Sequence, residues 1–494
     1  RAFLNGWQSW SGSGGSVIGA GGEPDPSRHT AAPGLLRAMF HADDAVAPDG
    51  AWRSELVTAV AGDGGAAVLG FAGGADHDGT FWLRPGEIVA EAFLGGAQFQ
   101  PGERRVLHDI LMRAGDPHDG LDHWATWAGA RSGARTTAPY TVGWCSWYHY
   151  FHAVTEADLR ANLALAANGQ WPFDVFQLDD GYQSAIGDWL TRAPAFPSPL
   201  EEMAATIAAA GMRPGIWIAP FLCSPNSEVA TAHPDWIVRR PSGRPMIGNV
   251  NPEWGGEQYV LDVTRADVQQ HLSDVARTLV AMGWTYLKLD FTYAPSFRGE
   301  WADPSLSPAQ RVRAGYDAIR AGAGDDAFLL GCGAPLGPCI GAVDGMRIGP
   351  DVAPVWAAPP RPYGYDDTGP ATRNAWRNTL ARAFMHRRLW LNDPDCLMLR
   401  SSATSLTPAQ IAAWARAVAA SGGMALVSDD LALLGDGERA VLDDVVATGR
   451  AVDGASLAGA PPRCPDLLDR WTPARLESAT TSLIADPDSG TLLT

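Results

Sequence analysis

From Thr141 onward the chain repeats one pattern, in which a short apolar segment is followed by a longer segment rich in Ala and Leu at helical period. This alternation is typical of βα units, in which a helix joins two neighbouring parallel strands. Eight strand-like segments follow one another: TVGWCSW from Thr141, DVFQLDD from Asp174, RPGIWIAP from Arg213, YLKLDF from Tyr286, FLLGCGAP from Phe328, GMRIGPD from Gly345, LWLNDPD from Leu389 and MALVSDD from Met424. Eight such units close a barrel, so the sequence predicts an α/β fold with a (β/α)8 TIM barrel.

Helix start signals stand between several of these strands. A Ser or Thr followed three residues later by an acidic or amide side chain satisfies the free N–H groups of a first helical turn. This pattern occurs at Thr155 with Asp158, at Ser307 with Gln310 and at Thr407 with Gln410. Two departures from an ideal barrel are expected: a long insertion between 223 and 261, and a helix-poor link between the fifth and sixth strands.

The chain is long enough for more than one domain, because its 494 residues exceed the size at which one hydrophobic core keeps growing. Residues 1–135 are rich in Gly, Asp and Pro around short apolar runs, which predicts an N-terminal β-sandwich domain. The small and polar stretch 128–138 is interpreted as a linker, and the barrel is placed at 136–435. Residues 436–494 are interpreted as a small C-terminal β domain.

Charge and apolar pattern narrow the classes of partner. The net charge of −18 argues against nucleic acid, because binding to its backbone relies on clustered Lys and Arg. No apolar run is long enough for a membrane span, and no signal-peptide pattern opens the chain. We expect a cytoplasmic monomer or small homo-oligomer without membrane contact. The chain begins at Arg1 instead of Met, so we expect its native start to be missing.

Cysteine and histidine usage points to no metal site. The six cysteines are scattered without a CxxC motif, and the eleven histidines include no HExxH motif. Buried thiols in a reducing compartment are expected. The twenty tryptophans have two interpretations that composition leaves open, namely core filling and apolar platforms for sugar rings.

Acidic residues end strand after strand. Barrel enzymes place their catalytic groups at these C-terminal strand ends. The acidic strand ends are Asp179 and Asp180, Asp290, Asp351, Asp393 and Asp395, and Asp429 and Asp430. For any one of them, capping of the following helix is the simplest interpretation, since Asp is common at that place.

Two of these aspartates have a cation nearby. Lys288 precedes Asp290 by two residues and Arg347 precedes Asp351 by four. Alternation along a strand puts Lys288 and Asp290 on the same face, where the cation is expected to keep the carboxylate ionised as a nucleophile requires. Two facing carboxylates without a metal or a phosphate loop favour glycoside hydrolysis, in which one attacks and the other exchanges a proton.

The adjacent pair Asp179 and Asp180 has a different predicted use. At a strand end the backbone can turn both carboxylates toward a ligand, where they accept hydrogen bonds from vicinal hydroxyl groups. A polar site built for a hydroxyl rejects sugars that lack it. The pair is therefore a candidate specificity site.

These residues stand in motifs that resemble glycoside hydrolase family 36, the α-galactosidases or melibiases. The motifs are GWCSWYHYF (143–151), QLDDGYQ (177–183), GIWIAPF (215–221), YLKLDF (286–291), LGCGAPLGPCIGAVDGMRIGPD (330–351) and WLNDPDCLMLR (390–400), together with the N-terminal GWQSWS (6–11). The resemblance covers nearly the whole chain in order and is loose in 12–135 and after 435. It implies a retaining exo-acting enzyme without cofactor that takes small α-galactosides such as melibiose and raffinose-type oligosaccharides.

The resemblance also implies a role for individual residues. Asp290 is implied to be the nucleophile and Asp351 the acid/base. The implied sugar-binding residues are Asp179 and Asp180 for the 4- and 6-hydroxyls, Lys288 and Arg347 for the other ring hydroxyls, Trp217, Trp147 and Tyr148 as apolar walls, and Cys332 near the 2-hydroxyl. Plain packing is the alternative for Trp217, Trp147 and Cys332.

Other activities stay open at this point. The segment Cys332–Gly333–Ala334–Pro335 replaces the glycine-rich CSGGG-type segment of the larger tetrameric members, so the chain resembles the smaller ones. An α-N-acetylgalactosaminidase needs room for an acetamido group near Cys332, and a raffinose-type transglycosylase needs an acceptor site. A Schiff-base aldolase using Lys288 and a non-catalytic glycan-binding protein are the alternatives from other classes.

Overall fold

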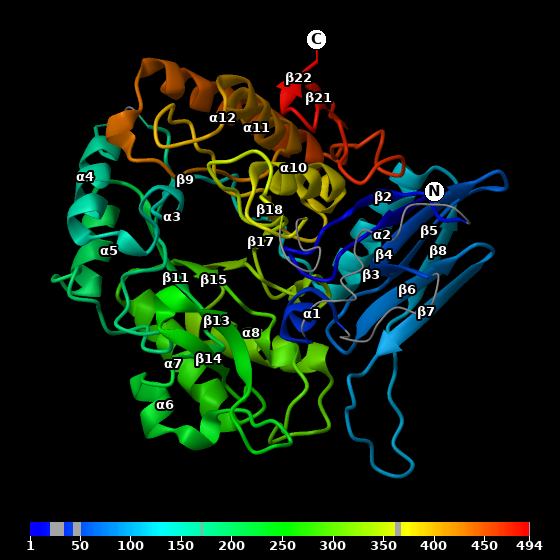
Figure 1. The fold of residues 1–494 in the computed structure, drawn as a ribbon, viewed down its shortest axis with the longest axis horizontal. Helices are drawn as coiled ribbons and strands as arrows, with labels where there is room; N and C mark the ends of the chain where they lie inside the picture. The colour runs from blue at the N-terminus through cyan, green and yellow to red at the C-terminus, as the bar shows by residue number, and fades with distance from the viewer. Residues whose placement is uncertain (20–33, 43–50, 169–170, 361–366, 494) are drawn as a thin grey trace.

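The computed structural model describes residues 1–19, 34–42, 51–168, 171–360 and 367–493 (Figure 1). Its centre is a sheet of eight parallel strands in the order β18-β17-β16-β15-β11-β10-β9-β19. The strands are β9 (Val142–Cys145), β10 (Val175–Leu178), β11 (Arg213–Ile218), β15 (Tyr286–Leu289), β16 (Phe328–Gly331), β17 (Gly345–Arg347), β18 (Leu391–Asp393) and β19 (Ala425–Val427). Each coincides with one of the eight predicted segments.

The sheet closes on itself between β18 and β19. The backbone N–H of Met424 donates to the carbonyl of Asn392 at 2.9 Å, and Leu397 forms a parallel bridge with Val427. These strands are short and buried on both sides, as expected for a sheet enclosed by helices. The predicted (β/α)8 barrel is therefore confirmed.

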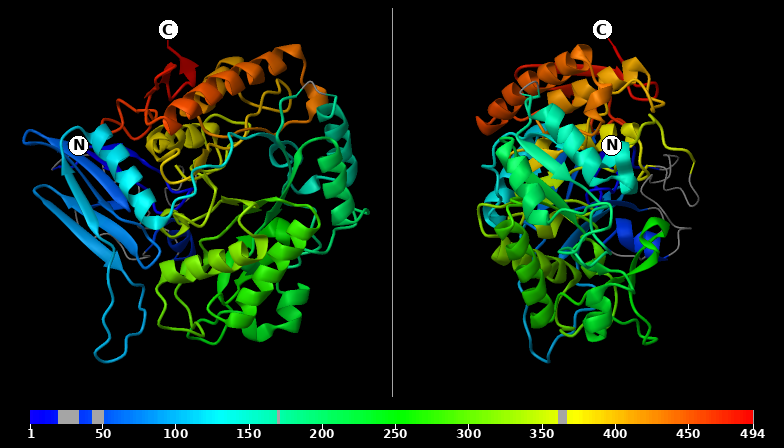
Figure 2. Two further views of the ribbon diagram at one scale, coloured as in Figure 1. Left: turned by 180° about the vertical axis from the view of Figure 1, so that it is seen from behind. Right: turned by 90° about the vertical axis from the view of Figure 1, so that its left-hand side faces the viewer.

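Helices surround the barrel on its outside (Figures 1 and 2). They are α4 (Glu156–Ala166), α5 (Leu200–Ala209), α7 (Ala266–Ala281), α8 (Pro308–Ala323), α9 (Leu336–Cys339), α10 (Thr372–Ala381), α11 (Pro408–Ser421) and α12 (Asp436–Leu457). All three predicted capping boxes form, because Thr155, Ser307 and Thr407 each accept from the backbone N–H three residues on. The expected helix-poor link between the fifth and sixth strands is the four-residue helix α9.

The N-terminal part forms two antiparallel sheets beside the barrel (Figure 2). One contains β1 (Ala2–Leu4), β2 (Gly14–Ser16), β4 (Val57–Gly62), β5 (Gly65–Phe71) and β8 (Ile110–Ala114); the other contains β3 (Trp52–Glu55), β6 (Asp78–Arg84) and β7 (Glu87–Phe93). Two helices accompany them, α1 (Gly34–Phe40) and α2 (Pro117–Ser132). The expected linker at 128–138 is wrong in its first part, because residues 128–132 are the last turns of α2.

The predicted insertion after the third strand is a small unit of its own. It contains β12 (Leu222–Cys223), α6 (Glu228–Ala232), β13 (Ile247–Asn251) and β14 (Gly256–Val260), and its strands pair as a three-stranded antiparallel sheet. A single-turn 3-10 helix at Pro252–Trp254 joins β13 to β14. This turn carries Trp254 back toward the barrel strands.

The C-terminal region differs from its prediction. Residues 436–457, expected to begin a β domain, form the 22-residue helix α12, which packs against α11. Its buried positions Leu442, Val445, Val446 and Gly449 follow the three-to-four spacing of an amphipathic helix. Only the following segment is a sheet, formed by β20 (Arg475–Glu477), β21 (Ser482–Asp486) and β22 (Thr491–Leu492).

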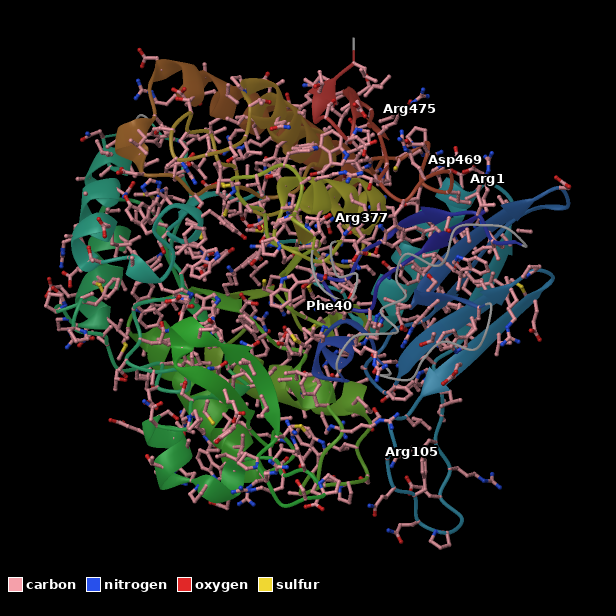
Figure 3. All side chains as sticks on the ribbon, in the orientation of Figure 1. Arg1, Phe40, Arg105, Arg377, Asp469 and Arg475 are labelled. Carbon is pink, nitrogen blue, oxygen red and sulfur yellow. The ribbon has the colours of Figure 1, made fainter. Side chains whose placement is uncertain are left out.

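The N-terminal segment is anchored to the barrel by backbone hydrogen bonds. Ser9 N–H donates to the Ala334 carbonyl at 2.9 Å, and the buried guanidinium of Arg382 donates to the carbonyls of Gly6, Gln8, Ser9 and Ser11. Burial lowers the pKa of Arg382 to about 9. At the rim, Arg1 pairs with Asp469 at 2.5 Å, where the first strand meets the C-terminal segment (Figure 3).

All six cysteines are free and buried, as expected. Across the described ranges, no helix combines the length and the apolar character that a membrane crossing needs.

Candidate active site

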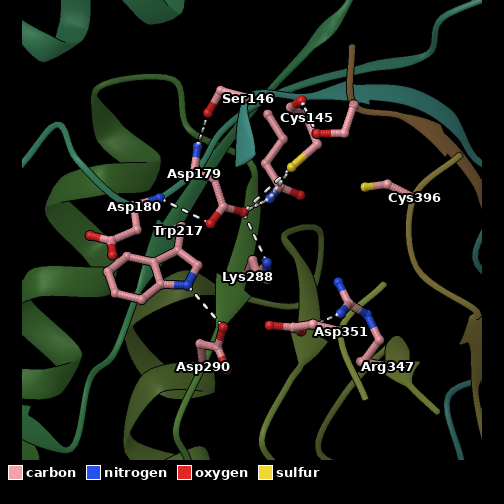
Figure 4. A network of polar contacts seen from close by, with 12 residues as sticks. Cys145, Ser146, Asp179, Asp180, Trp217, Lys288, Asp290, Arg347, Asp351 and Cys396 are labelled. Atoms are coloured by element: carbon pink, nitrogen blue, oxygen red, sulfur yellow. Dashed lines mark hydrogen bonds and ion pairs between the residues drawn. The ribbon is translucent and has the colours of Figure 1, made fainter. Parts of the chain in front are cut away.

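The acidic strand ends meet at one mouth of the barrel because all eight strands run in the same direction. Asp179 and Asp180 follow β10, Asp290 follows β15, and Asp351 lies four residues beyond the end of β17. Figure 4 shows their side chains converging, with Asp351 reaching toward Asp290 from two strands away. The structure therefore brings together the two carboxylates that the sequence predicted to face each other.

Asp290 is held by two neutral donors. Its Oδ2 accepts from Trp217 Nε1 at 3.0 Å and its Oδ1 from the backbone N–H of Phe291 at 2.8 Å. Burial raises the pKa of Asp290, against the opposing charge of Lys288. Phe291 itself has a φ of 54°, a left-handed conformation that costs a bulky residue strain and is typical of functional sites.

The expected effect of Lys288 on Asp290 is only partly right. Lys288 Nζ makes its ion pair with Asp179 Oδ2, at 2.9 Å. Burial alone lowers the pKa of Lys288, but the charge of Asp179, together with Cys332 and Asp290, raises it well above its usual value. Lys288 still favours ionisation of Asp290, yet burial outweighs it, so the lysine does not bring the pKa of Asp290 below its ordinary range.

Arg347 is shared among three carboxylates. It contacts Asp351 Oδ1 at 3.1 Å, Asp393 Oδ2 at 3.2 Å and Asp395 Oδ2 at 2.8 Å. The side chain of Asp351 is 33% exposed, while that of Arg347 is 3% exposed. The predicted pairing of Arg347 with Asp351 is present, and the strand-seven aspartates join it from β18.

The adjacent aspartates face different partners. Besides Lys288, Asp179 Oδ2 accepts from Gln177 Nε2 at 2.5 Å. Asp180 Oδ2 accepts from Trp254 Nε1 at 2.8 Å and lies 3.1 Å from His152 Nδ1. Burial lowers the pKa of His152, but the hydrogen bond to Asp180 and the charges of the nearby carboxylates together raise it above its usual value.

Two of the three residues predicted as apolar walls, Tyr148 and Trp217, also donate hydrogen bonds to carboxylates. Tyr148 donates its hydroxyl to Asp395 Oδ2 at 2.5 Å, and Trp217 donates to Asp290. Trp147 lies edge-on to His152, with ring centroids 4.9 Å apart. Cys332 is fully buried, and burial raises the pKa of its thiol in the field of Asp290, Arg347 and Lys288.

The sequence interpretation missed the aromatic side chains that surround Asp290. Trp254 packs against Phe291 with ring centroids 5.0 Å apart, and Trp10 packs against the same ring at 5.1 Å. Gly333 is needed beside Trp10, because its φ is +50° and a Cβ there would meet the indole at 2.9 Å. Trp52 and Trp82 of the N-terminal domain, which are other tryptophans that could have covered the mouth, lie within its sheets, as part of β3 and β6.

Of the acidic pair after β19, the capping interpretation holds for Asp430 and not for Asp429. Asp430 accepts from the backbone N–H of Ala432, and Asp429 pairs with the buried Arg400 at 2.5 Å. Within the part of the chain that the structure describes, no group of three His, Cys, Asp or Glu is arranged to hold a metal ion.

Comparison with known proteins places this geometry in a family. The family model described as Melibiase matches residues 145–296. An α-galactosidase from Thermus thermophilus, solved in complex with stachyose, is 30% identical, with 90% of each chain covered and a TM-score of 0.71. The chain belongs to the melibiase family, glycoside hydrolase family 36.

Further relatives support the family and its fold. The Thermus protein in complex with p-nitrophenyl α-D-galactopyranoside matches this chain with a TM-score of 0.76 at 28% identity, covering 98% of this chain and 90% of the other. The family 36 α-galactosidase AgaA from Geobacillus stearothermophilus has the same fold at 16% identity, with a TM-score of 0.60 and coverage of 90% of this chain and 62% of the other.

Sequence matches to curated relatives are shorter. The curated AgaA of Geobacillus stearothermophilus is 32% identical over 139 residues, which are 28% of this chain and 17% of its own length. An Escherichia coli α-galactosidase is 34% identical over 95 residues, which are 18% of this chain and 12% of its own length. The chain therefore matches much less than two thirds of the length of these curated relatives.

The family model covers only part of the candidate site of this chain. Asp179, Asp180, Trp217, Lys288 and Asp290 lie inside residues 145–296. The partners around the second carboxylate lie outside it: Cys332, Arg347, Asp351, Asp393 and Asp395.

Proposed function

We propose that this member of the family is a retaining exo-acting α-galactosidase, which hydrolyses terminal α-galactosyl residues of small galactosides such as melibiose and raffinose-type oligosaccharides. The observation that carries the proposal is the convergence of Asp290 and Asp351 at one barrel mouth, in a chain 30% identical to an α-galactosidase over 90% of its length. Two carboxylates around one glycosidic bond suffice for this chemistry without a cofactor.

Asp290 is the proposed nucleophile. Its carboxylate attacks the anomeric carbon while the glycosidic C–O bond breaks, which forms a β-linked glycosyl-enzyme ester. The hydrogen bond from Trp217 and that from the Phe291 N–H fix the orientation of the carboxylate before substrate arrives. Such fixed geometry lowers the entropy cost of reaching the transition state.

Asp351 is the proposed acid/base. In the first step it gives its proton to the leaving glycosidic oxygen; in the second it takes a proton from the water that attacks the anomeric carbon and releases Asp290. Its 33% exposed side chain supports this role, because a leaving group and a water molecule must both reach it. Two inversions at one carbon return α-galactose, so the configuration is retained.

Sugar recognition is proposed for the buried carboxylates and cations beside Asp290. Asp179 and Asp180 are proposed to accept hydrogen bonds from the 4- and 6-hydroxyls, with Lys288 and Arg347 on the other ring hydroxyls. Charge-assisted hydrogen bonds of this kind are stronger than neutral ones and penalise a sugar whose hydroxyl points elsewhere. Trp217, Trp147 and Tyr148 are proposed to flank the ring, and Cys332 to lie near the 2-hydroxyl.

The aldolase alternative loses support from the geometry of Lys288. A Schiff base needs a neutral amine, whereas the ion pair with Asp179 and the other acidic groups around Lys288 raise its pKa well above its usual value. The N-acetylgalactosaminidase and transglycosylase alternatives use the same two carboxylates and differ in what they bind.

The test compares aryl α-galactoside, aryl α-N-acetylgalactosaminide and aryl α-glucoside, with product anomers of the best substrate followed by NMR. The expected result is fastest turnover of the galactoside with α-galactose formed first. Faster turnover of the acetamido sugar would contradict the assignment at the 2-position. β-Galactose as first product would remove Asp290 as nucleophile, and absence of turnover on all three would reject the proposed activity.

A further inference from the structure

Asp395 is a buried carboxylate held in an unusual backbone conformation at the barrel mouth. Its side chain is 0% exposed, and its φ is 89°, which is rare for a residue with a Cβ. Such a conformation is strained and persists only where surrounding contacts enforce it. The contacts that hold Asp395 in this conformation therefore indicate its role.

The contacts of Asp395 lead to the second proposed catalytic carboxylate by two routes. Asp395 Oδ2 accepts from the backbone N–H of Val352 at 2.8 Å, and Val352 is the residue after Asp351. The same oxygen lies 2.8 Å from Arg347 Nη1, and that nitrogen also contacts Asp351 Oδ1 at 3.1 Å. Asp395 therefore touches both the backbone that carries Asp351 and the cation that neutralises it.

Two further donors fix Asp395 itself. The hydroxyl of Tyr148 donates to Oδ2 at 2.5 Å, and the backbone N–H of Cys396 donates to Oδ1 at 2.7 Å. Tyr148 is fully buried and belongs to a different barrel segment, after β9. Donors thus surround the carboxylate from three segments of the barrel, which leaves it no alternative position.

We propose that Asp395 is a positioning residue for Asp351: it fixes the Val352 peptide and shares the charge of Arg347, so that Asp351 can hold the proton it gives to the leaving group. The inference rests on the proposed role of Asp351 as acid/base. Asp395 is not proposed to touch the sugar.

Arg347 couples the charges of Asp395 and Asp351 because it contacts both carboxylates. A cation beside a carboxylate favours the ionised form of that carboxylate. While Asp395 is ionised, part of the charge of Arg347 is neutralised, and Asp351 keeps its proton more readily. When the charge of Asp395 is removed, Arg347 holds Asp351 in its ionised form, which cannot act as an acid.

The titratable groups that face Asp395 and Asp351 come from several segments of the barrel. The charged and titratable groups facing Asp395 and Asp351 are Arg347 on β17, Asp393 on β18, Tyr148 after β9, Cys396 beside Asp395, and Asp290 after β15. Burial raises the pKa of Asp395 to about 7, against the charge of Arg347. Protonation of Asp395 thus takes place near neutral pH, where a change in the charge of this cluster affects turnover.

The test replaces Asp395 by Asn, which keeps the shape and removes the charge. The rate constant kcat/KM is measured against pH for p-nitrophenyl α-galactoside and methyl α-galactoside, since only the methyl leaving group depends on a proton. We expect Asp395→Asn to lose at least about tenfold more activity on the methyl than on the aryl galactoside. The alkaline limb of the pH profile is expected to move to lower pH by about one unit.

Asp453 provides a matched control. It is also a buried aspartate paired with a buried arginine, Arg387, at 2.6 Å, but it lies on α12 and pairs with His386 as its other partner. Asp453→Asn therefore reproduces the loss of a buried ion pair away from the strand ends. It is expected to lower the melting temperature and to change kcat/KM by the same factor for both substrates.

Equal losses on the two substrates by Asp395→Asn, or an unmoved alkaline limb, would overturn the proposal. If that variant does not fold, as judged by circular dichroism, Tyr148→Phe is used instead, because it removes one donor to Asp395. It must show a larger loss of kcat/KM on the methyl than on the aryl galactoside, by a smaller factor than Asp395→Asn. Failure of the wild-type protein on every α-galactoside would instead reject the proposed function, so the two outcomes are distinguishable.

Discussion

The two proposed catalytic carboxylates lie at one barrel mouth in contrasting surroundings. Asp290 is 7% exposed and is held by an indole and a backbone N–H, which are both neutral donors. The Asp351 side chain is 33% exposed and is held by the guanidinium of Arg347. The end of the site with the proposed nucleophile is buried and fixed, while the end with the proposed acid/base is open and charged.

This contrast follows from what each group does in the proposed reaction. A nucleophile must be aligned with one carbon atom, and burial between rigid donors aligns it at the cost of a raised pKa. A proton donor must meet different leaving groups and then water, which requires an accessible carboxyl. The fold meets both requirements because β15 ends among aromatic side chains, whereas β17 ends at Arg347, which several carboxylates share.

The largest effect is expected from Asp290→Ala. Without a nucleophile the glycosyl-enzyme cannot form, so kcat should fall by about 10⁴-fold or more on every α-galactoside. Steady-state kinetics measures the loss, and circular dichroism with a thermal melt checks that the fold is kept. Azide should restore turnover from the β face and give β-galactosyl azide.

Preserved activity in Asp290→Ala would contradict its role outright. Formation of α-galactosyl azide by this variant would contradict it as well, because azide would then be replacing the second-step water and not the nucleophile.

Asp351→Ala is expected to have the next largest effect, and one that depends on the leaving group. Loss of a general acid should cost about 10²- to 10⁴-fold on melibiose, whose leaving group needs a proton, and much less on an activated aryl galactoside. Azide needs no base to attack the glycosyl-enzyme and should give α-galactosyl azide. Opposite anomers from the two alanine variants would separate the two ends chemically, whereas equal losses on both substrates would contradict the acid/base assignment.

The barrel could be predicted from the sequence because its signals are local. Each strand is a short apolar run, and the three capping boxes at Thr155, Ser307 and Thr407 are satisfied within four residues. Helix α12 was missed, because its Gly- and Asp-rich sequence has weak helix propensity and is stabilised by packing on α11.

The site could be predicted only in part, for a related reason. Its carboxylates stand at strand ends, so their position follows from the barrel. Their partners depend on tertiary structure: Lys288 could have paired with either neighbouring aspartate, and the structure selects Asp179. Trp254 arrives from an insertion and Trp10 from the N-terminal domain, and no spacing in the sequence connects either to Asp290.

Trp217→Phe sharpens the contrast at the nucleophile end. The change keeps a ring and removes the indole N–H that donates to Asp290 at 3.0 Å. A hydrogen bond to a charged group contributes about 1.5–3 kcal/mol, so kcat/KM should fall by about ten- to a hundredfold. The loss should be similar for aryl and methyl galactosides, since the acid/base end is untouched.

The pH profile of Trp217→Phe gives a second readout with a definite sign. Asp290 must be ionised to attack, and burial already raises its pKa, so the acid limb of kcat/KM is expected above the ordinary range of a carboxyl group. The Trp217 hydrogen bond lowers that pKa, so its removal should move the acid limb further up. A shift of the acid limb to lower pH would contradict the assignment of that limb to Asp290.

The smallest effect is expected from Trp254→Phe. This change removes the donor to Asp180 Oδ2 but leaves His152 Nδ1 at 3.1 Å and the Gln183 amide at 2.6 Å from the same carboxylate. Because two partners remain, Asp180 should stay near its position, and KM for aryl α-galactoside should rise only about three- to tenfold with kcat nearly unchanged.

Trp189→Phe is the matched control for Trp254→Phe. Trp189 also packs against Trp217, with ring centroids 5.7 Å apart compared with 5.9 Å for Trp254, and is likewise an indole of this aromatic cluster. A rise in KM confined to Trp254→Phe would assign Asp180 and its donors to substrate binding. A fall in kcat at unchanged KM would instead connect Trp254 to Asp290 through the ring of Phe291, and would mean that the buried end of the site extends over both aspartates.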